Sequence, residues 1–448
     1  MRPHEWASVL PILSQGYDDA PMLSKQLFIL YANANNLAVA GTLIHDNYKS
    51  SVSRPKKDGL MSEAKSVSLG TWRVGVLFSR SGPLKITQSE HFYGTELAIR
   101  QINESGGILG QAIEVVAYDP ASEPSEFRRL ADRLLTDDGI SVIFGCSSSA
   151  ERKAVLPAIE RRDGLLWYPS PYEGFEYSPN VIYTGATPNQ NSFPLAEYLV
   201  RHVGRRLFFV GSDYVYPRES NRVMRDLVES YDGEVVNEIY VPMDASDAEL
   251  LRVLKQIGRQ QPDAVFSTIV GSAARRFYRM YIEAGFDPES VPIASLTMTE
   301  GEISAIGPEH CVGHITSAGY FGSLDSVANR RFVADYRAAF GADRPVSIYS
   351  ASAYAQVLLF AEALRIAGTL DTQQLVEAAQ ELTVMAPEGQ ITIDAENNHC
   401  WLWPRIGRVC ATGEFKILWE ATAPVKPDPY IAISPFGASW IGEPEALG

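Results

Sequence analysis

Cysteine is scarce in this sequence, with four residues among 448. Cys146, Cys311, Cys400 and Cys410 are widely separated, form no CxxC pair and have no metal-ligand spacing with any of the seven histidines. This is not the pattern of a disulfide scaffold or a zinc site. We expect buried thiols instead, and we expect neither a metal nor another cofactor.

Basic charge and long apolar runs are also lacking. The formal net charge is −15, with 39 Lys and Arg against 54 Asp and Glu, and no local basic patch opposes it. Direct nucleic-acid binding is therefore not expected. No apolar run reaches the ~18–20 residues of a membrane-spanning helix. The 46% of hydrophobic residues is enough for packed cores, and the chain is long enough for two domains.

The motifs of common nucleotide-binding and hydrolytic sites are absent. A dinucleotide-binding fingerprint, GxGxxG, would follow the first strand, but the stretch at that position, from Gly75 to Gly82, does not contain it. No Walker loop occurs either. Ser149 stands at the end of GCSSS instead of in a GxSxG elbow, and no histidine occupies an interpretable position beside it. We therefore expect a binding protein and not an enzyme.

The first sixty residues differ in composition from the rest. They carry six Lys and Arg and five Asp and Glu, a net charge of +1, so the remaining residues carry −16. Asn33, Asn35 and Asn36 interrupt the only apolar stretch, which is shorter than the ~7–15 residues of a signal peptide core. We expect residues 1–70 to be a poorly ordered extension and the working protein to begin near Met61. We expect it to be cytoplasmic; a periplasmic location is the alternative.

Apolar runs and amphipathic segments alternate from residue 73 onward, a pattern typical of parallel strands with crossover helices. The first half has predicted strands at 73–78, 113–117, 141–144 and 165–168 and helices at 91–103, 125–135 and 151–160. The second half has predicted strands at 207–210, 235–240, 264–268, 293–296 and 314–318 and helices at 219–231, 247–259 and 275–284. Two further long helices are predicted at 328–340 and 350–367. We expect lobe 1 to comprise residues 71–187 and 320–386, lobe 2 to comprise 188–319 and 387–435, and 436–448 to form a tail.

Polar loops follow several predicted strands at their carboxyl ends, where open α/β sheets bind ligands. Cys146 to Ser149 lie between a strand and a helix, where backbone N–H groups can form a nest for a carbonyl or carboxylate oxygen. A serine N-cap without a ligand is the alternative. Residues 168–177 are rich in rings and hydroxyls, and residues 211–217 supply Tyr214 and Tyr216. A single tyrosine is often a packing residue, but these loops together predict a ligand cleft between two lobes.

The same loops resemble those of the amide-sensing negative regulators of bacterial aliphatic amidase operons and of the related urea-binding proteins of urea transporters. The matching stretches are 146–149, 152–155, 168–179, 186–191, 211–221, 293–297 and 427–430. This resemblance covers residues 72–432 and implies an α/β fold of the type I periplasmic-binding-protein class. In that fold, two doubly wound parallel-sheet lobes are joined by a hinge that the chain crosses several times.

Carried over residue by residue, the resemblance implies that the hydroxyl and N–H of Ser149, with Ser170 and Tyr214, hold an amide. The other candidate ligand-binding residues are Tyr168 in the wall, Ser147, Pro171, Tyr216, Gly271 and, as a weaker candidate, Thr297. Asp213 and Glu300 leave open a carboxylate for the ammonium group of an amino acid. In this chain Ser147 replaces an aromatic residue of the related proteins and Ser170 replaces a threonine. Because both changes enlarge the cavity, we expect the larger amides to bind best.

The implied function is a sensor that closes over a short aliphatic amide without making or breaking a bond. Its implied partners are an RNA-binding antiterminator protein, through which it controls an amidase operon, and a second copy of the chain. The alternative is the solute-binding subunit of an ABC transporter for urea or short-chain amides, which delivers its ligand to a membrane permease. Fold and pocket are the same in both, so they do not separate the two roles.

Overall fold

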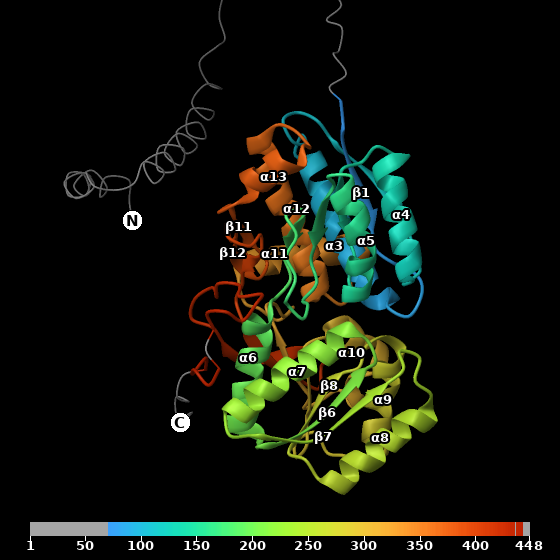
Figure 1. Cartoon of the computed structure of the whole chain (residues 1–448), viewed down its shortest axis with the longest axis vertical. Coiled ribbons are helices and arrows are strands. Elements are labelled where there is room, and N and C mark those ends of the chain that lie inside the picture. The colour runs from blue at the N-terminus through green and yellow to red at the C-terminus, as the bar shows by residue number, and fades with distance from the viewer. Residues whose placement is uncertain (1–69, 435, 442–448) are drawn as a thin grey trace, which may run out of the picture. The chain divides into compact units, whose positions relative to one another are not determined.

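A computed structural model describes residues 70–434 and 436–441. They belong to the compact unit Ser68–Gly448, and the unit Met1–Val67 lies outside the described residues. The expected disorder of residues 1–70 and the expected start at Met61 therefore also lie outside them, apart from Gly70. Within the described unit, helices and strands form two lobes, each built on its own sheet (Figure 1).

Lobe 1 is built on a five-stranded parallel sheet. Its strands have the spatial order β2-β1-β3-β4-β5. Their bounds are β1 (Trp72–Leu77), β2 (Ile113–Tyr118), β3 (Val142–Gly145), β4 (Leu165–Tyr168) and β5 (Val181–Tyr183). Every residue of β3, β4 and β5 is buried, which is what a parallel sheet covered on both faces requires and why these strands read as continuous apolar runs.

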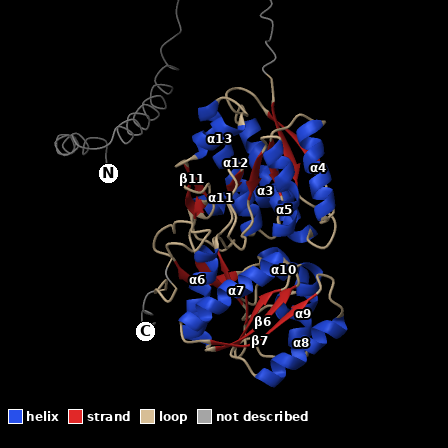
Figure 2. Cartoon of the chain, viewed as in Figure 1, coloured by secondary structure: helices blue, strands red, loops and turns tan. Residues whose placement is uncertain are grey.

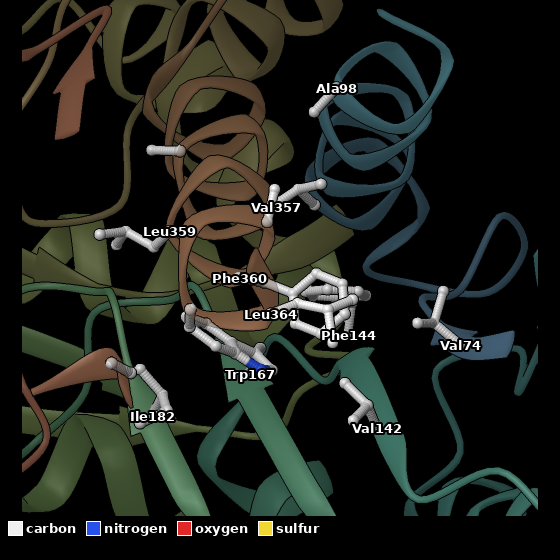
Figure 3. Close-up of a cluster of buried hydrophobic side chains, with 14 of the residues drawn as sticks. Val74, Ala98, Val142, Phe144, Trp167, Ile182, Val357, Leu359, Phe360 and Leu364 are labelled. Atoms are coloured by element: carbon white, nitrogen blue, oxygen red, sulfur yellow. The ribbon is translucent and has the colours of Figure 1, made fainter. Parts of the chain in front are cut away.

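Helices cover both faces of this sheet. Their bounds are α3 (Lys85–Glu104), α4 (Pro124–Thr136), α5 (Ser149–Arg161), α11 (Val327–Phe340), α12 (Ile348–Ala367) and α13 (Thr372–Ala379). Side chains of α3 and α12 share one core cluster with one face of the strands, and side chains of α4 and α5 share another cluster with the opposite face. In the first cluster Phe360 of α12 meets Phe144 and Trp167 edge to face, with ring centroids 5.2 and 6.0 Å apart (Figure 3).

Lobe 2 is built on a seven-stranded sheet of spatial order β15-β14-β10-β9-β8-β6-β7. Its strands are β6 (Arg206–Ser212), β7 (Glu234–Val241), β8 (Ala264–Thr268), β9 (Ile293–Ser295), β10 (Ile315–Ala318), β14 (Arg405–Val409) and β15 (Phe415–Glu420). Strands β6 to β10 pair in parallel, and β14 and β15 add an antiparallel edge. This second sheet therefore receives its last two strands from the C-terminal part of the chain.

The helices of lobe 2 also divide between two faces (Figure 2). They are α6 (Pro188–Tyr198), η1 (Leu199–Val203), α7 (Val215–Ser230), α8 (Asp247–Gln260), α9 (Gly271–Glu283), α10 (Glu300–Ile306) and η2 (Pro308–His310). Helices α6 and α7 pack on one face, whereas α8 and α9 pack on the other. Across the boundary between the lobes, α5 meets α7 and α3 meets α10 (Figure 1).

A small antiparallel sheet changes the expected division of the chain. It consists of β11 (Thr383–Ala386), β12 (Gly389–Ile393) and β13 (Cys400–Trp401). Ile391, Ile393 and Cys400 lie in the same core cluster as the strands of lobe 1, whereas residues 387–435 were expected in lobe 2. We therefore propose that the last crossing into lobe 2 follows Leu402, immediately before β14.

The C-terminal residues 436–441 are the described part of the expected tail. The start of the expected tail packs on α6 of lobe 2, where Phe193 contacts the rings of Phe436 and Trp440. Three cysteines are buried free thiols as predicted, but Cys410 is only half-buried.

None of the described helices is by itself long and apolar enough to cross a membrane. Among them, only the strongly bent pair α12 and α13 has the length and composition of a span when the two are taken together.

Candidate functional site

A cavity lies between the lobes at the carboxyl ends of the parallel strands. Loops that follow β3 and β4 of lobe 1 and β6, β8 and β9 of lobe 2 line it, as do the start of α9 and one residue of α12. This is the position at which open α/β sheets bind ligands. Its volume, measured to the centre of a water-sized sphere, is about 60 Å³.

Eight of the nine predicted ligand-binding residues line this one cavity. They are Ser147, Ser149, Ser170 and Pro171 from lobe 1, and Tyr214, Tyr216, Gly271 and Thr297 from lobe 2. The ninth, Tyr168, does not line it. Its hydroxyl donates to the Ser147 carbonyl at 2.8 Å, and its ring lies against the Arg152 guanidinium. Tyr168 therefore supports residues 146–149, here called the serine loop, from behind and does not form part of the cavity wall.

The serine loop is shaped by the capping of α5. Ser148 caps the helix, and the backbone N–H groups of Ser147 and Ser148 both donate to the Glu151 carboxylate, at 2.8 and 2.9 Å. The predicted nest is thus wrong for these two N–H groups, because Glu151 already occupies them. The N–H groups of Ser149 and Ala150 open the helix, where no carbonyl of the preceding turn can accept from them. These two are the backbone donors that remain for a ligand.

Serine hydroxyls on the lobe 1 side are organised by buried neighbours. Ser149 Oγ donates to the Glu173 carboxylate, and Ser170 Oγ donates to Ser147 Oγ at 3.3 Å. The Ser170 hydroxyl also lies 3.3 Å from Nε2 of His91. Burial lowers the pKa of His91 to about 3, so this imidazole is neutral at physiological pH. The serine hydroxyls are therefore held by hydrogen bonds to buried groups behind the cavity, a neutral imidazole at Ser170 and a carboxylate at Ser149.

Three tyrosines contribute phenols from the lobe 2 side: Tyr214, Tyr216 and Tyr278. Burial raises the pKa of each above the usual tyrosine value, so their hydroxyls stay protonated and can donate. The hydroxyls of Tyr216 and Tyr278 are buried without a hydrogen-bond partner among the described residues. Ser220 and Ser295 lie near them but not in hydrogen-bonding geometry. Because burying an unpaired hydroxyl costs free energy, both hydroxyls are available to donate to an acceptor on a ligand.

A carboxylate that the sequence analysis did not single out also lines the cavity. Glu302 of α10 is 7% exposed and pairs with Arg275 Nη1 at 3.1 Å, and burial raises its pKa. The two acidic residues considered from the sequence do not line the cavity: Asp213 pairs with Arg218 at the surface, and Glu300 accepts from the Gly322 N–H. The spacing from Thr299 to Glu302 is a capping signature, which could have marked Glu302.

Cationic and metal-binding groups are not found at this site. The residues that line the cavity include no lysine, arginine or histidine. In residues 70–434 and 436–441, no group of three or more His, Cys, Asp or Glu side chains could hold a metal ion. An anionic ligand would therefore meet one carboxylate and no cationic side chain.

The fold and the cavity together define a two-lobed ligand-binding protein of the type I periplasmic-binding-protein fold, which confirms the predicted fold class. A family model described as "Periplasmic binding protein domain" matches residues 72–435, so the chain belongs to that family. It is similar to Leu/Ile/Val-binding protein homolog 6 of Brucella melitensis, with 26% identity over 336 residues that cover 73% of this chain and 84% of the relative.

Two solved structures illustrate the shared fold. A solute-binding protein of an ABC transporter from Rhodopseudomonas palustris BisB5, in complex with 3,4-dihydroxybenzoic acid, has a TM-score of 0.72 at 22% identity and covers 80% of this chain and 99% of its own. A branched-chain amino acid transporter substrate-binding protein from Streptococcus pneumoniae, in complex with isoleucine, has a TM-score of 0.69 at 21% identity, with coverages of 80% and 100%. At these identities the likeness shows the fold and not the ligand.

Proposed function

We propose that this protein is the solute-binding component of a membrane transporter and closes over a small neutral amide, either a short aliphatic amide or urea. The observation that carries the proposal is the inter-lobe cavity itself. It is lined by hydroxyls of both lobes and by no cationic side chain. Binding then stabilises the closed arrangement because the ligand contacts both lobes at once. No bond is made or broken, and the protein is not an enzyme.

The size of the cavity supports a small ligand. About 60 Å³ of the cavity is open to the centre of a water-sized sphere. Acetamide, propionamide and urea are closer to this size than isoleucine or dihydroxybenzoate. We therefore infer that the smaller amides bind better than the larger amides expected from Ser147.

The polarity of the cavity supports an amide. A neutral amide has a carbonyl that accepts hydrogen bonds and an NH2 group that donates them. The hydroxyls of Tyr216 and Tyr278 and the first N–H groups of α5 can donate to the carbonyl. Serine oxygens and the Glu302 carboxylate can accept from the NH2 group. A carboxylate ligand offers acceptors alone and would lie near Glu302.

The transporter role is supported by the two solved structures of the same fold, which are a solute-binding protein and a substrate-binding protein of transporters. The relative named as a Leu/Ile/Val-binding protein homolog agrees with a small-ligand-binding role. An extracytoplasmic location and a membrane permease as partner go with that role. The second candidate is the cytoplasmic amide sensor with an antiterminator partner and a dimeric state. The loops around Ser149, Tyr168 and Tyr214 favour it, because they resemble those of the amide-sensing regulators.

Calorimetry on the full chain tests the ligand. We expect one-to-one binding of acetamide, propionamide or urea, with weaker binding of butyramide and no comparable binding of leucine or benzoate. Tight binding of leucine or benzoate with no response to any amide would overturn the proposal. Cell fractionation tests the role: an extracytoplasmic product supports the transporter component, and a cytoplasmic product that co-purifies with an RNA-binding protein supports the sensor.

A further inference from the structure

The hydroxyl proton of Ser149 has a fixed direction. Ser149 Oγ donates to Oε2 of Glu173, a residue 3% exposed in the loop after β4. Glu173 is ion-paired with Arg152, whose guanidinium is fully buried, at 3.5 Å. An ionised carboxylate accepts hydrogen bonds and cannot donate them. The single proton of the Ser149 hydroxyl therefore points toward Glu173.

The remaining capacity of Ser149 Oγ is to accept. A hydroxyl has one proton and two lone pairs. One lone pair faces Arg152 Nη1, which lies 3.4 Å from Ser149 Oγ. The other has no partner among the described residues, and Ser149 lines the cavity. Toward a ligand, the Ser149 hydroxyl is thus an acceptor and not a donor.

A neighbouring carboxylate provides an internal comparison. Glu176 also pairs with Arg152, at 2.5 Å, and with Lys153, at 2.6 Å. It has no hydrogen bond to Ser149 among the described contacts. Neither Glu173 nor Glu176 lines the cavity. Two carboxylates therefore share one arginine, but only Glu173 sets the direction of a hydroxyl at the site.

We propose that Glu173 is a specificity-determining residue that, through Ser149, makes the cavity select amides over carboxylates of the same shape. The inference rests on the proposed function and names its chemical basis. An amide places an N–H against the Ser149 lone pair, whereas a carboxylate oxygen places a second lone pair there. Glu173 does not touch the ligand, so it is a positioning residue.

The test compares propionamide with propionate, two ligands of nearly equal shape, by calorimetry on the full chain at neutral pH. The parent protein is expected to bind propionamide about 10- to 100-fold more tightly than propionate. In Glu173→Gln, the glutamine NH2 can donate to Ser149 Oγ, which frees the serine proton to turn toward the cavity. The ratio of the two affinities is then expected to fall at least about 10-fold.

Two controls separate this effect from a loss of structure or of charge. Glu176→Gln removes the other carboxylate on Arg152 and should leave the affinity ratio unchanged. Ser149→Ala should lower the ratio, and adding Glu173→Gln to it should change the ratio no further, because the effect of Glu173 passes through the missing hydroxyl. A simple charge effect of Glu173 would persist in the Ser149→Ala background.

Each outcome separates the inference from the function on which it rests. If the parent binds neither propionamide nor any related amide, the proposed function is overturned, and this inference with it. If the parent binds propionamide but Glu173→Gln keeps the parent ratio, the inference alone is overturned. Should Glu173→Gln fail to fold, Ser149→Ala decides: an unchanged ratio in that variant overturns the inference, and a reduced ratio supports it.

Discussion

Replacing Tyr278 by phenylalanine should change ligand affinity and protein stability in opposite directions. The Tyr278 hydroxyl is buried at the cavity, and no described residue forms a hydrogen bond with it. In the free protein its removal takes away an unpaired polar group, whose burial costs about 1–3 kcal/mol. With ligand bound, its removal takes away a donor to the ligand carbonyl. The free variant should therefore be as stable as the parent or more stable, yet bind the ligand less well.

The expected magnitudes follow from hydrogen-bond energetics. Leaving a buried acceptor on the ligand unsatisfied costs about 1–3 kcal/mol, which corresponds to a roughly 5- to 150-fold loss of affinity. A gain of about 1 kcal/mol would raise Tm by roughly 2–4 °C for a domain of about 150–250 residues, the size of one lobe, and by less if both lobes unfold together. Calorimetry with acetamide gives the first quantity, and thermal unfolding without ligand gives the second.

Tyr281 supplies a matched control on the same helix. It is fully buried in α9, but it does not line the cavity, and its hydroxyl donates to the Val291 carbonyl at 2.7 Å. Tyr281→Phe should therefore lower stability by about 0.5–1.5 kcal/mol and leave amide affinity unchanged. If Tyr278→Phe destabilises the free protein while binding amide as the parent does, the assignment of its hydroxyl to the ligand is refuted.

Three further predictions concern two buried charged groups and one tyrosine that lines the cavity. Burial raises the pKa of Glu388 from 4.5 to about 7, so its stabilising contribution is full below pH 4.5 and is lost as pH rises through about 7. Relative to the parent, the free energy of unfolding of Glu388→Gln should rise by about 2.5 kcal/mol between pH 5 and pH 8 in urea unfolding, and a pH-independent difference would contradict this. Arg152→Met leaves Glu173 and Glu176 without their buried shared cation, with only the exposed Lys153 as a partner, so urea unfolding should show a loss of about 3–5 kcal/mol; a loss below about 1 kcal/mol would argue against the network. Tyr214→Phe should weaken acetamide binding by roughly 5- to 150-fold in calorimetry if its phenol contacts the ligand, and an unchanged Kd would remove it from the site.

The alternation of strands and helices was predictable because it depends on runs of apolar residues. The predicted strands at 141–144, 165–168 and 264–268 correspond to β3, β4 and β8, whose residues are all buried. The cleft was predictable for a related reason, since parallel strands carry their following loops to one edge. The individual candidate residues came from the family resemblance, and eight of the nine line this cavity.

Elements whose buried residues are polar escaped prediction. Helix α3 begins at Lys85, whereas it was predicted to begin at residue 91. Its first turns were missed because the buried residue there is Gln88, which accepts from the Ser79 N–H and donates to Glu151. Helix α6 was not predicted: it contains two prolines, and its buried Gln190 donates to the carbonyls of Cys400 and Val425 far along the chain. Such partners are invisible in a hydrophobic pattern.

The same limitation explains the serine loop. Its sequence predicted free backbone N–H groups, but Glu151 folds back onto Ser147 and Ser148 and uses them. The direction of the Ser149 proton depends on Glu173, which lies 24 residues further along the chain. Spacing alone does not encode that contact, because it forms only when β3 and β4 lie side by side in the sheet.

A crystal structure of the full chain grown with acetamide tests the central claim most directly. The account predicts acetamide between the lobes, with its nitrogen within hydrogen-bond distance of Ser149 Oγ and its oxygen facing the hydroxyls of Tyr216 and Tyr278. Acetamide bound elsewhere would contradict the account, as would a larger carboxylate ligand retained in the cavity in its place.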